Sequence, residues 1–236
     1  MAGEWRPAKI AAARAAVERW VRPGQRLALG TGSTAAEAVR AIAERFPGAS
    51  FDCVASSRAT EELALSLGIP VRPLRADDRF DLMLDGADEV TPSLDLTKGG
   101  GGALFREKFL AHLSDEVVIL VDPTKLVTGL GEKSPIPVEV VPFARPVVER
   151  QVAALGYRVL ARDGPHGSSG PTDNGNEILD LVPPAPLADP AGAHRALRDL
   201  LGVVETGIFV GLADRLVIGY PDGHVDERRA VAPRRH

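Results

Sequence analysis

Short apolar runs alternate with amphipathic stretches along the first part of the chain, and this alternation is the strongest constraint on the fold. Residues 27–29, 51–55, 69–71, 82–84 and 117–121 have the pattern of short buried strands. Apolar residues repeat at helical spacing within 10–21, 35–46, 58–67 and 103–113. Strands and helices that alternate at this spacing predict an α/β fold, with a parallel sheet covered by helices on both faces.

The pattern changes after Gly131, where several prolines interrupt the chain. The expected strands are 138–141, 157–161 and 177–182, and the expected helices are 147–155 and 194–201. They predict a small α+β domain over residues 131–207. The apolar runs 208–210 and 216–218 are expected to return to the main sheet, so that residues 1–130 and 208–236 form the first domain. Gly164–Gly175 predicts a loop. The tail from Asp222, with Arg228, Arg229, Arg234 and Arg235, is expected to be solvated.

Composition excludes several classes of function. The net charge of −4 provides no basic field for nucleic acid or an anionic membrane surface. No apolar run approaches the roughly 20 residues of a membrane span, and Met1–Pro7 lacks the apolar core of a signal peptide. The single cysteine, Cys53, excludes an internal disulfide and suits a reducing compartment. We therefore expect a cytoplasmic protein.

The first candidate motif is Gly30-Thr31-Gly32-Ser33-Thr34-Ala35, between a strand and a helix. It has the spacing of a dinucleotide fingerprint, and Asp52 lies about twenty residues further on. The acid of that fingerprint follows the far end of its strand, however, whereas Asp52 begins one and Ser56-Ser57 stands at the far end. Three hydroxyls beside the N–H groups of a helix start suit a terminal phosphate better. An ordinary capped turn explains the motif equally well.

The second motif, Asp85-Gly86-Ala87-Asp88-Glu89, directly follows a buried strand. Ligands of open α/β sheets bind beyond the carboxyl ends of the strands, where Asp85 and Asp88 are expected to lie. Two such carboxylates suit a hydroxylated ligand or a metal ion. A plain acidic turn gives the same spacing.

The third motif is the most informative, because four consecutive glycines, Gly99–Gly102, separate Lys98 from a helix. Such a backbone can direct several N–H groups at one anion, and Lys98 adds a cation. Glu107 is expected in the second turn of the helix, within reach of a ligand held by this loop. Lys125 follows the strand 117–121 and either reaches the same edge of the sheet or is a surface lysine.

The histidines are scattered and Cys53 has no evident partner histidine, so neither a zinc site nor acyl-transfer chemistry is expected. The three loops together supply hydroxyls, paired carboxylates and a glycine-rich anion site followed by a glutamate. This set suits a small phosphorylated, polyhydroxylated substrate that undergoes proton transfer next to a carbonyl.

The motifs together resemble ribose-5-phosphate isomerase, type A. The resemblance runs from about residue 10 to Gly223 and rests on the following segments: 31–34, 85–89, 98–108, 138–140, 172–176 and 204–209. It implies a Rossmann-like α/β domain with a small α+β lid, and no metal or cofactor. It also implies a homo-oligomer, either a dimer or a tetramer. The implied reaction is the interconversion of D-ribose 5-phosphate and D-ribulose 5-phosphate.

The resemblance also implies residue roles. Glu107 matches the proton-transferring base, Asp85 and Asp88 match carboxylates that bind sugar hydroxyls, and Lys98 matches a residue that stabilises the enediolate. The implied substrate-binding residues are Thr31, Gly32, Ser33, Thr34, Asp85, Gly86, Ala87, Asp88, Lys98, Gly99, Gly100, Gly101 and Lys125. The family often has a lysine on its first helix near the phosphate. An ungapped register places Ile10 there, with Lys9 beside it.

Three alternatives stay open at this point. A sugar-phosphate deaminase or lactonase of similar structure would use a histidine, and none lies in the three loops. A sugar-phosphate sensor would need a helix-turn-helix, for which the residues before Ile10 are too few. A dinucleotide-binding enzyme is the third.

Overall fold

The computed structural model describes residues 5–160, 162 and 170–231. The first half of the predicted loop Gly164–Gly175, the first four residues of the chain, and Arg234 and Arg235 lie outside the described residues. The chain divides into two compact units. The first comprises Met1–Gly86, Arg106–Lys125 and Gly211–His236, and the second comprises Ala87–Phe105 and Leu126–Val210.

A six-stranded sheet forms the centre of the first unit, with the strand order β13-β12-β6-β3-β1-β2. Five strands are parallel neighbours, and only β13 runs antiparallel, beside β12. The strands are β1 (Arg26–Leu29), β2 (Asp52–Ala55), β3 (Leu82–Gly86), β6 (Val117–Val121), β12 (Arg215–Gly219) and β13 (Val225–Arg229). The predicted α/β class is therefore confirmed.

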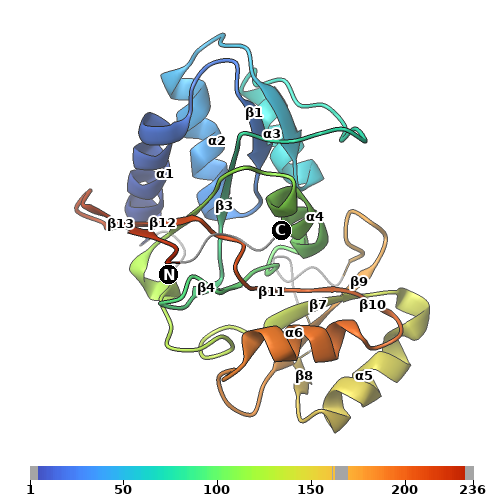
Figure 1. Cartoon of the computed structure of the whole chain (residues 1–236). Helices are drawn as coiled ribbons and strands as arrows, with labels where there is room; N and C mark the ends of the chain where they lie inside the picture. The colour runs from blue at the N-terminus through green and yellow to red at the C-terminus, as the bar shows by residue number, and fades with distance from the viewer. Residues whose placement is uncertain (1–4, 161, 163–169, 232–236) are drawn as a thin grey trace. The chain divides into compact units, whose positions relative to one another are not determined.

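Helices lie on both faces of this sheet, as right-handed crossovers require. In Figure 1, α1 and α2 lie together on one face, where α3 packs against α2, and α4 lies on the opposite side of β3. The helices are α1 (Arg6–Trp20), α2 (Ser33–Arg45), α3 (Arg58–Ser66) and α4 (Leu104–His112). Alanines of α1 and apolar side chains of α2 pack against the central strands in one continuous core, which includes Val17, Ile42, Leu29 and Leu84. Burial of these residues stabilises the unit through the hydrophobic effect.

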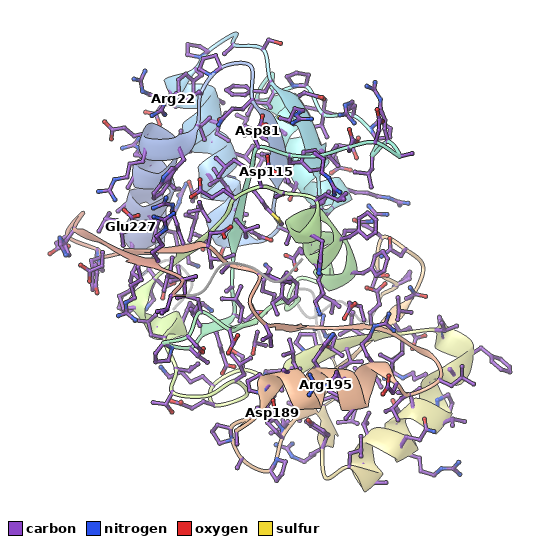
Figure 2. All side chains as sticks on the ribbon, viewed as in Figure 1. Arg22, Asp81, Asp115, Asp189, Arg195 and Glu227 are labelled. Carbon is purple, nitrogen blue, oxygen red and sulfur yellow. The ribbon has the colours of Figure 1, made fainter. Side chains whose placement is uncertain are left out.

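The strands of this unit differ from the sequence analysis at two places. Residues 69–71 form no strand: only Val71 makes an isolated bridge to Cys53, because Pro70 has no N–H to donate to a ladder. The described tail residues are exposed or half-buried, as expected of a solvated tail, but Val225–Arg229 forms the strand β13, which the sequence analysis missed. Glu227, labelled in Figure 2, accepts hydrogen bonds from Arg19 at 2.7 Å and Arg215 at 2.9 Å, which hold this edge strand.

The second unit contains two antiparallel sheets, ordered β10-β7-β9-β8 and β11-β5-β4. Val148 and Val152 of one helix and Leu197 of another join the core on the four-stranded sheet. Asp189, labelled in Figure 2, begins the second of these helices by accepting the Gly192 N–H at 2.9 Å. The elements are β4 (Glu89–Val90), β5 (Leu96–Thr97), β7 (Ile136–Val140), α5 (Arg145–Ala154), β8 (Arg158–Leu160), β9 (Glu177–Val182), α6 (Pro190–Arg198), β10 (Val203–Thr206), β11 (Ile208–Phe209) and the 3-10 helices η1 (Pro123–Lys125, in the first unit) and η2 (Pro142–Ala144).

The two units differ from the predicted domains in three segments: residues 87–105, 126–130 and 208–210 all belong to the second unit. Residues 87–105 group with the second unit, since β4 pairs with β5 and β5 pairs with β11. The run 208–210 does not return to the main sheet, because β11 pairs with β5. Residues on short strands such as Glu89–Val90 carry too little periodicity to reveal these pairings in the sequence.

Cys53 is expected to resist thiol reagents while the protein is folded. Its side chain is buried in β2, and burial raises the pKa of the thiol to about 12. The thiolate is the reactive form, so at pH 8 only about one molecule in ten thousand carries it. Titration with Ellman's reagent should therefore detect no free thiol in the native protein and one thiol in denaturant. A thiol that reacts rapidly in the native protein would contradict this burial.

Candidate active site

The loop between β1 and α2 presents backbone N–H groups at the start of a helix. Gly32, directly before α2, has φ 104°, a left-handed conformation that favours glycine. The first helical hydrogen bond runs from the Ala36 N–H to the Gly32 carbonyl, so the N–H groups of the first turn have no acceptor within the helix. This arrangement attracts anions through both the N–H groups and the helix dipole.

Lys9 brings a cation to the same loop. It extends from α1, and its Nζ donates to the Ser33 hydroxyl at 2.9 Å. The neighbouring position that the ungapped register indicates, Ile10, is apolar. Lys9 is therefore the lysine of α1 that reaches the start of α2.

The Thr31 hydroxyl is directed into the protein, toward two serines at the end of β2, and not toward the start of α2. Its Oγ1 lies 2.6 Å from the Ser56 Oγ and 2.8 Å from the Ser57 Oγ. Both serines are buried at the end of β2, at the position where a dinucleotide fingerprint would require an acid. These contacts do not fit the prediction that the Thr31 hydroxyl binds a phosphate. The Thr31 N–H donates to Asp85 Oδ1 at 3.1 Å.

Asp85 ends β3 as a fully buried carboxylate. Its Oδ1 accepts the N–H groups of Thr31 and Gly86, the latter at 2.7 Å. A Cβ at Gly30 would lie 2.1 Å from this oxygen, so only glycine fits there. Sequence reasoning recognised Gly30 as part of a turn but missed that it makes room for the carboxylate.

Asp52, the candidate acid of the dinucleotide fingerprint, has a different partner. Arg72 donates to both of its carboxylate oxygens, at 2.5 and 2.8 Å, and this contact lowers the pKa of Asp52. The same guanidinium binds Asp78, whose pKa it lowers to about 2. Asp52 is thus one side of a three-residue ion-pair network at the start of β2.

In the second unit, Asp88 binds the glycine loop, Gly99–Gly102. Its Oδ2 accepts the Gly100 N–H at 2.8 Å. A Cβ at Gly100 would lie 2.9 Å from Asp88, and one at Gly99, where φ is 99°, would lie 2.6 Å from Leu104. The loop therefore requires glycine at both positions, and the sequence prediction that it is an ordered loop rather than a linker is confirmed.

Lys98 precedes this loop and is only 3% exposed. Its N–H donates to the Gly207 carbonyl at 2.9 Å, and its Nζ lies 5.6 Å from the centre of the Phe209 ring. An ammonium group over an aromatic face is attracted by the ring. Because Lys98 is buried, the groups packed around it, including the Phe209 ring, fix the position of its ammonium group.

Glu107 and Lys125 belong to the first unit. Glu107 is 3% exposed and lies in the first turn of α4, not in the second as predicted, because the helix begins at Leu104. Lys125 ends η1, which starts after the buried Asp122. Asp122 accepts hydrogen bonds from the N–H and the hydroxyl of Thr124, and these contacts hold the short helix.

Two buried glutamates that sequence reasoning passed over organise the second unit. Glu89 accepts four hydrogen bonds: from the Gly131, Lys133 and Ser134 N–H groups and from the Thr97 hydroxyl. Glu139, also fully buried, binds the segment Thr172–Asn176, which was expected to be structural. Its Oε1 accepts from Thr172, Asn174 and Asn176 at 2.9 to 3.2 Å. The signal for Glu139 was an acidic residue inside an apolar strand, whereas Glu89 stood within the acidic motif and carried no separate signal.

Among the described residues there is neither a group of metal-ligating side chains nor a helix that could span a membrane. No three histidine, cysteine or acidic side chains group there as metal ligands would. No helix in that part of the chain has the length and apolar character needed to cross a bilayer.

Comparison with known proteins identifies the family. Residues 52–223 match the sequence profile of ribose 5-phosphate isomerase A (phosphoriboisomerase A). Ribose-5-phosphate isomerase A of Thermomicrobium roseum is 45% identical over 218 residues, which cover 92% of this chain and 91% of the relative. The chain belongs to the ribose 5-phosphate isomerase A family. It is therefore an aldose–ketose isomerase of the pentose phosphate pathway.

Solved structures agree with this assignment. Ribose 5-phosphate isomerase A of Methanocaldococcus jannaschii matches with a TM-score of 0.85 and 37% identity, over 94% of this chain and 98% of that one. A D-ribose-5-phosphate isomerase in complex with phospho-erythronic acid matches with a TM-score of 0.87 and 34% identity, over 94% and 97%. The α/β fold predicted from the motifs is thus the fold of ribose 5-phosphate isomerase A.

Proposed function

We propose that this isomerase interconverts D-ribose 5-phosphate and D-ribulose 5-phosphate through an enediolate, with the motif residues as its substrate-binding and catalytic groups. The observation that carries the proposal is the family membership together with the intact set of chemical groups. Asp85 and Asp88 stand three residues apart in the chain, and Glu107 follows the glycine loop within α4. Binding of the substrate involves Thr31, Gly32, Ser33, Thr34, Asp85, Gly86, Ala87, Asp88, Lys98, Gly99, Gly100, Gly101 and Lys125.

The phosphate binds at the start of α2 in this proposal. The N–H groups of the first turn, the Ser33 hydroxyl and the Lys9 ammonium all meet there, and together they neutralise a dianion. Thr31 contributes by holding the loop in place: its hydroxyl contacts Ser56 and Ser57, and its N–H donates to Asp85. Lys125 supplies a further cation to the substrate.

The proton moves through Glu107. As general base, its carboxylate removes the proton from C2 of the aldose, which leaves an enediolate, and returns it to C1 to form the ketose. Asp85 and Asp88 assist ring opening and the exchange of protons between O1 and O2. The electron pair stays within the substrate, so the reaction needs no external oxidant or reductant.

Lys98 and the glycine loop stabilise the negative charge that develops on the substrate oxygen. Ordered N–H donors and a buried ammonium group stabilise such a charge more than water does, because they need no reorganisation. The loop meets this requirement: Asp88 binds one of its N–H groups, and the Lys98 backbone is hydrogen-bonded to Gly207.

The test is ketose formation from ribose 5-phosphate in the presence of EDTA. We propose that catalysis needs no metal or other cofactor, so the rate should be the same with and without the chelator. Activity that is lost in EDTA and restored by a divalent ion would contradict the metal-free reaction. A folded protein that forms no ketose under either condition would contradict the proposed substrate.

We also propose that the protein acts in the cytoplasm, where a reducing environment suits its buried free thiol, Cys53.

A homo-oligomer, either a dimer or a tetramer, is the proposed assembly. Four apolar side chains of the second unit are exposed around the contact between Val141 and Gly202. Phe143 is 96% exposed and Leu201 is 91% exposed. An exposed group of large apolar residues is typical of a protein–protein interface. This apolar patch consists of Val141, Phe143, Val147 and Leu201.

Substitution within the apolar patch should dissociate the assembly. Phe143→Asp is expected to lower the mass measured by light scattering to that of a smaller species, because it places a charge in an apolar interface. Leu65→Asp is the control, since Leu65 is an exposed leucine of the first unit and should leave the mass unchanged. A wild-type protein that is monomeric at micromolar concentration would contradict the proposed assembly.

A further inference from the structure

Arg162 is a buried arginine at the end of β8, outside every motif discussed above. Its side chain is 7% exposed and pairs with Asp180 of β9, whose side chain is 12% exposed. The Nε donates to one Asp180 oxygen at 2.6 Å, and an Nη donates to the other at 2.7 Å. This two-point contact uses one edge of the guanidinium and fixes the plane of the group.

The same guanidinium also contacts the glycine loop. Its two Nη atoms lie 3.3 Å from the Gly100 carbonyl oxygen and 3.4 Å from the Gly99 carbonyl oxygen. These hydrogen bonds are long, whereas those to Asp180 are short, so Asp180 determines where the guanidinium sits. The guanidinium in turn attracts two consecutive carbonyl groups of the loop.

Those two contacts act together with the 2.9 Å hydrogen bond from the Gly102 N–H to the Gly99 carbonyl to set the direction of the loop peptides. In a trans peptide the carbonyl and the following N–H point in opposite directions. With the Gly99 carbonyl directed at Arg162, the Gly100 N–H points to the other side, where it donates to Asp88 at 2.8 Å. The Gly100 carbonyl orients the Gly101 N–H in the same way. Glycine peptides rotate more freely than others, so the loop needs such side-chain contacts to hold one orientation.

We propose that Arg162, held by Asp180, is a positioning residue that orients the Gly101 N–H of the glycine loop toward the charge that develops on the substrate, while Asp88 holds the Gly100 N–H. The proposal rests on the role of Lys98 and the glycine loop in stabilising the enediolate. Arg162 contacts the carbonyl side of the loop and acts on the substrate only through it. Its removal should therefore weaken stabilisation of the transition state more than binding of the substrate.

A second ion pair of the same unit provides a matched control. Arg145 of α5 binds Glu177 at 2.7 Å and Glu149 at 2.9 Å. Glu177 belongs to β9, the strand that carries Asp180. No hydrogen bond from Arg145 to the glycine loop is present among the described residues. Substitution of Arg145 thus tests the effect of losing the ion pairs of a half-buried arginine of the same unit without disturbing the glycine loop.

The experiment compares Arg162→Lys, Asp180→Asn and Arg145→Lys in kcat, KM and inhibition by phospho-erythronic acid, whose carboxylate stands in for the enediolate oxygens. Lysine keeps the charge but cannot bind Asp180 and both carbonyls at once. We expect Arg162→Lys to lower kcat about 10- to 100-fold, to change KM less than about threefold, and to weaken the inhibitor by a similar factor to kcat. Asp180→Asn should have the same kind of effect, and Arg145→Lys should have none.

Wild-type kcat and inhibition in folded Arg162→Lys and Asp180→Asn would overturn the proposal. So would an equal loss in Arg145→Lys, because the effect would then follow general stability. Lys98→Met separates this inference from the role on which it rests. If Lys98→Met loses activity while the Arg162 and Asp180 variants do not, only the positioning role fails. If Lys98→Met keeps wild-type kcat, the role of the loop fails, and the positioning role fails with it.

Discussion

Glu107→Gln is expected to lower kcat about 100-fold or more while KM changes little. Glutamine has nearly the shape of glutamate, so it fits the 3% exposed position in the first turn of α4. It cannot accept a proton, however, and the step from C2 to C1 then has no base. The measurement is steady-state ketose formation from ribose 5-phosphate. Proton exchange between the substrate and deuterated water should fall by the same factor, because both processes need the same base.

Glu62→Gln is the control for this substitution. Glu62 lies exposed on α3, and the change from carboxylate to amide there should leave kcat unaltered. Folding of both variants is checked by their thermal unfolding. A Glu107→Gln protein with near-wild-type kcat would mean that another group transfers the proton, and Asp85 and Asp88 would be the next candidates to substitute.

Glu89→Gln is expected to destabilise the protein by roughly 2 to 5 kcal/mol. The buried Glu89 carboxylate accepts two hydrogen bonds at each oxygen, at 2.5 to 3.0 Å. An amide has one acceptor oxygen, so its NH2 group would face two N–H or O–H donors without an acceptor for them. Since about 1 kcal/mol shifts the melting temperature of a protein of this size by about 2–4 °C, the expected decrease is about 4–20 °C. The measurement is thermal unfolding followed by circular dichroism.

Glu132→Gln is the matched control for Glu89→Gln. Glu132 also accepts an N–H and a hydroxyl, both from Thr128 at 2.7 and 2.6 Å, but it is exposed to solvent. Water can replace these hydrogen bonds, so the melting temperature should stay nearly unchanged. Equal melting temperatures for wild type and Glu89→Gln would contradict the structural role of this carboxylate.

The site residues could be predicted from the sequence because each motif is a short, continuous stretch of the chain. A strand followed by glycines and hydroxyls, as in Gly30–Thr34, needs no distant residue to be recognised. The same holds for the carboxylates at the end of β3 and for the glycine loop before α4. Periodicity in the apolar residues likewise sufficed for most strands and helices, since each pattern lies within a single element.

The errors arose where a partner far along the chain decides the outcome. Val225–Arg229 has little apolar character, and it becomes a strand because β12 offers a free edge and Arg19 and Arg215 bind Glu227. Ile208–Phe209 has the same apolar character as a central strand, yet it pairs with the short β5. The local pattern of apolar residues does not show which strand of a sheet has a free edge for pairing.

The sequence by itself determined the α/β class, the family and the loops that carry the chemistry, because periodicity, turn residues and motif spacing are local properties. Only the tertiary structure decided how those loops are held. Gly30 makes room for Asp85, Ser56 and Ser57 bind the Thr31 hydroxyl, and Glu89 accepts hydrogen bonds from four donors in two other segments. Arg162 reaches a loop 63 residues earlier in the chain. These contacts form between segments that are distant in sequence, and packing alone brings them together.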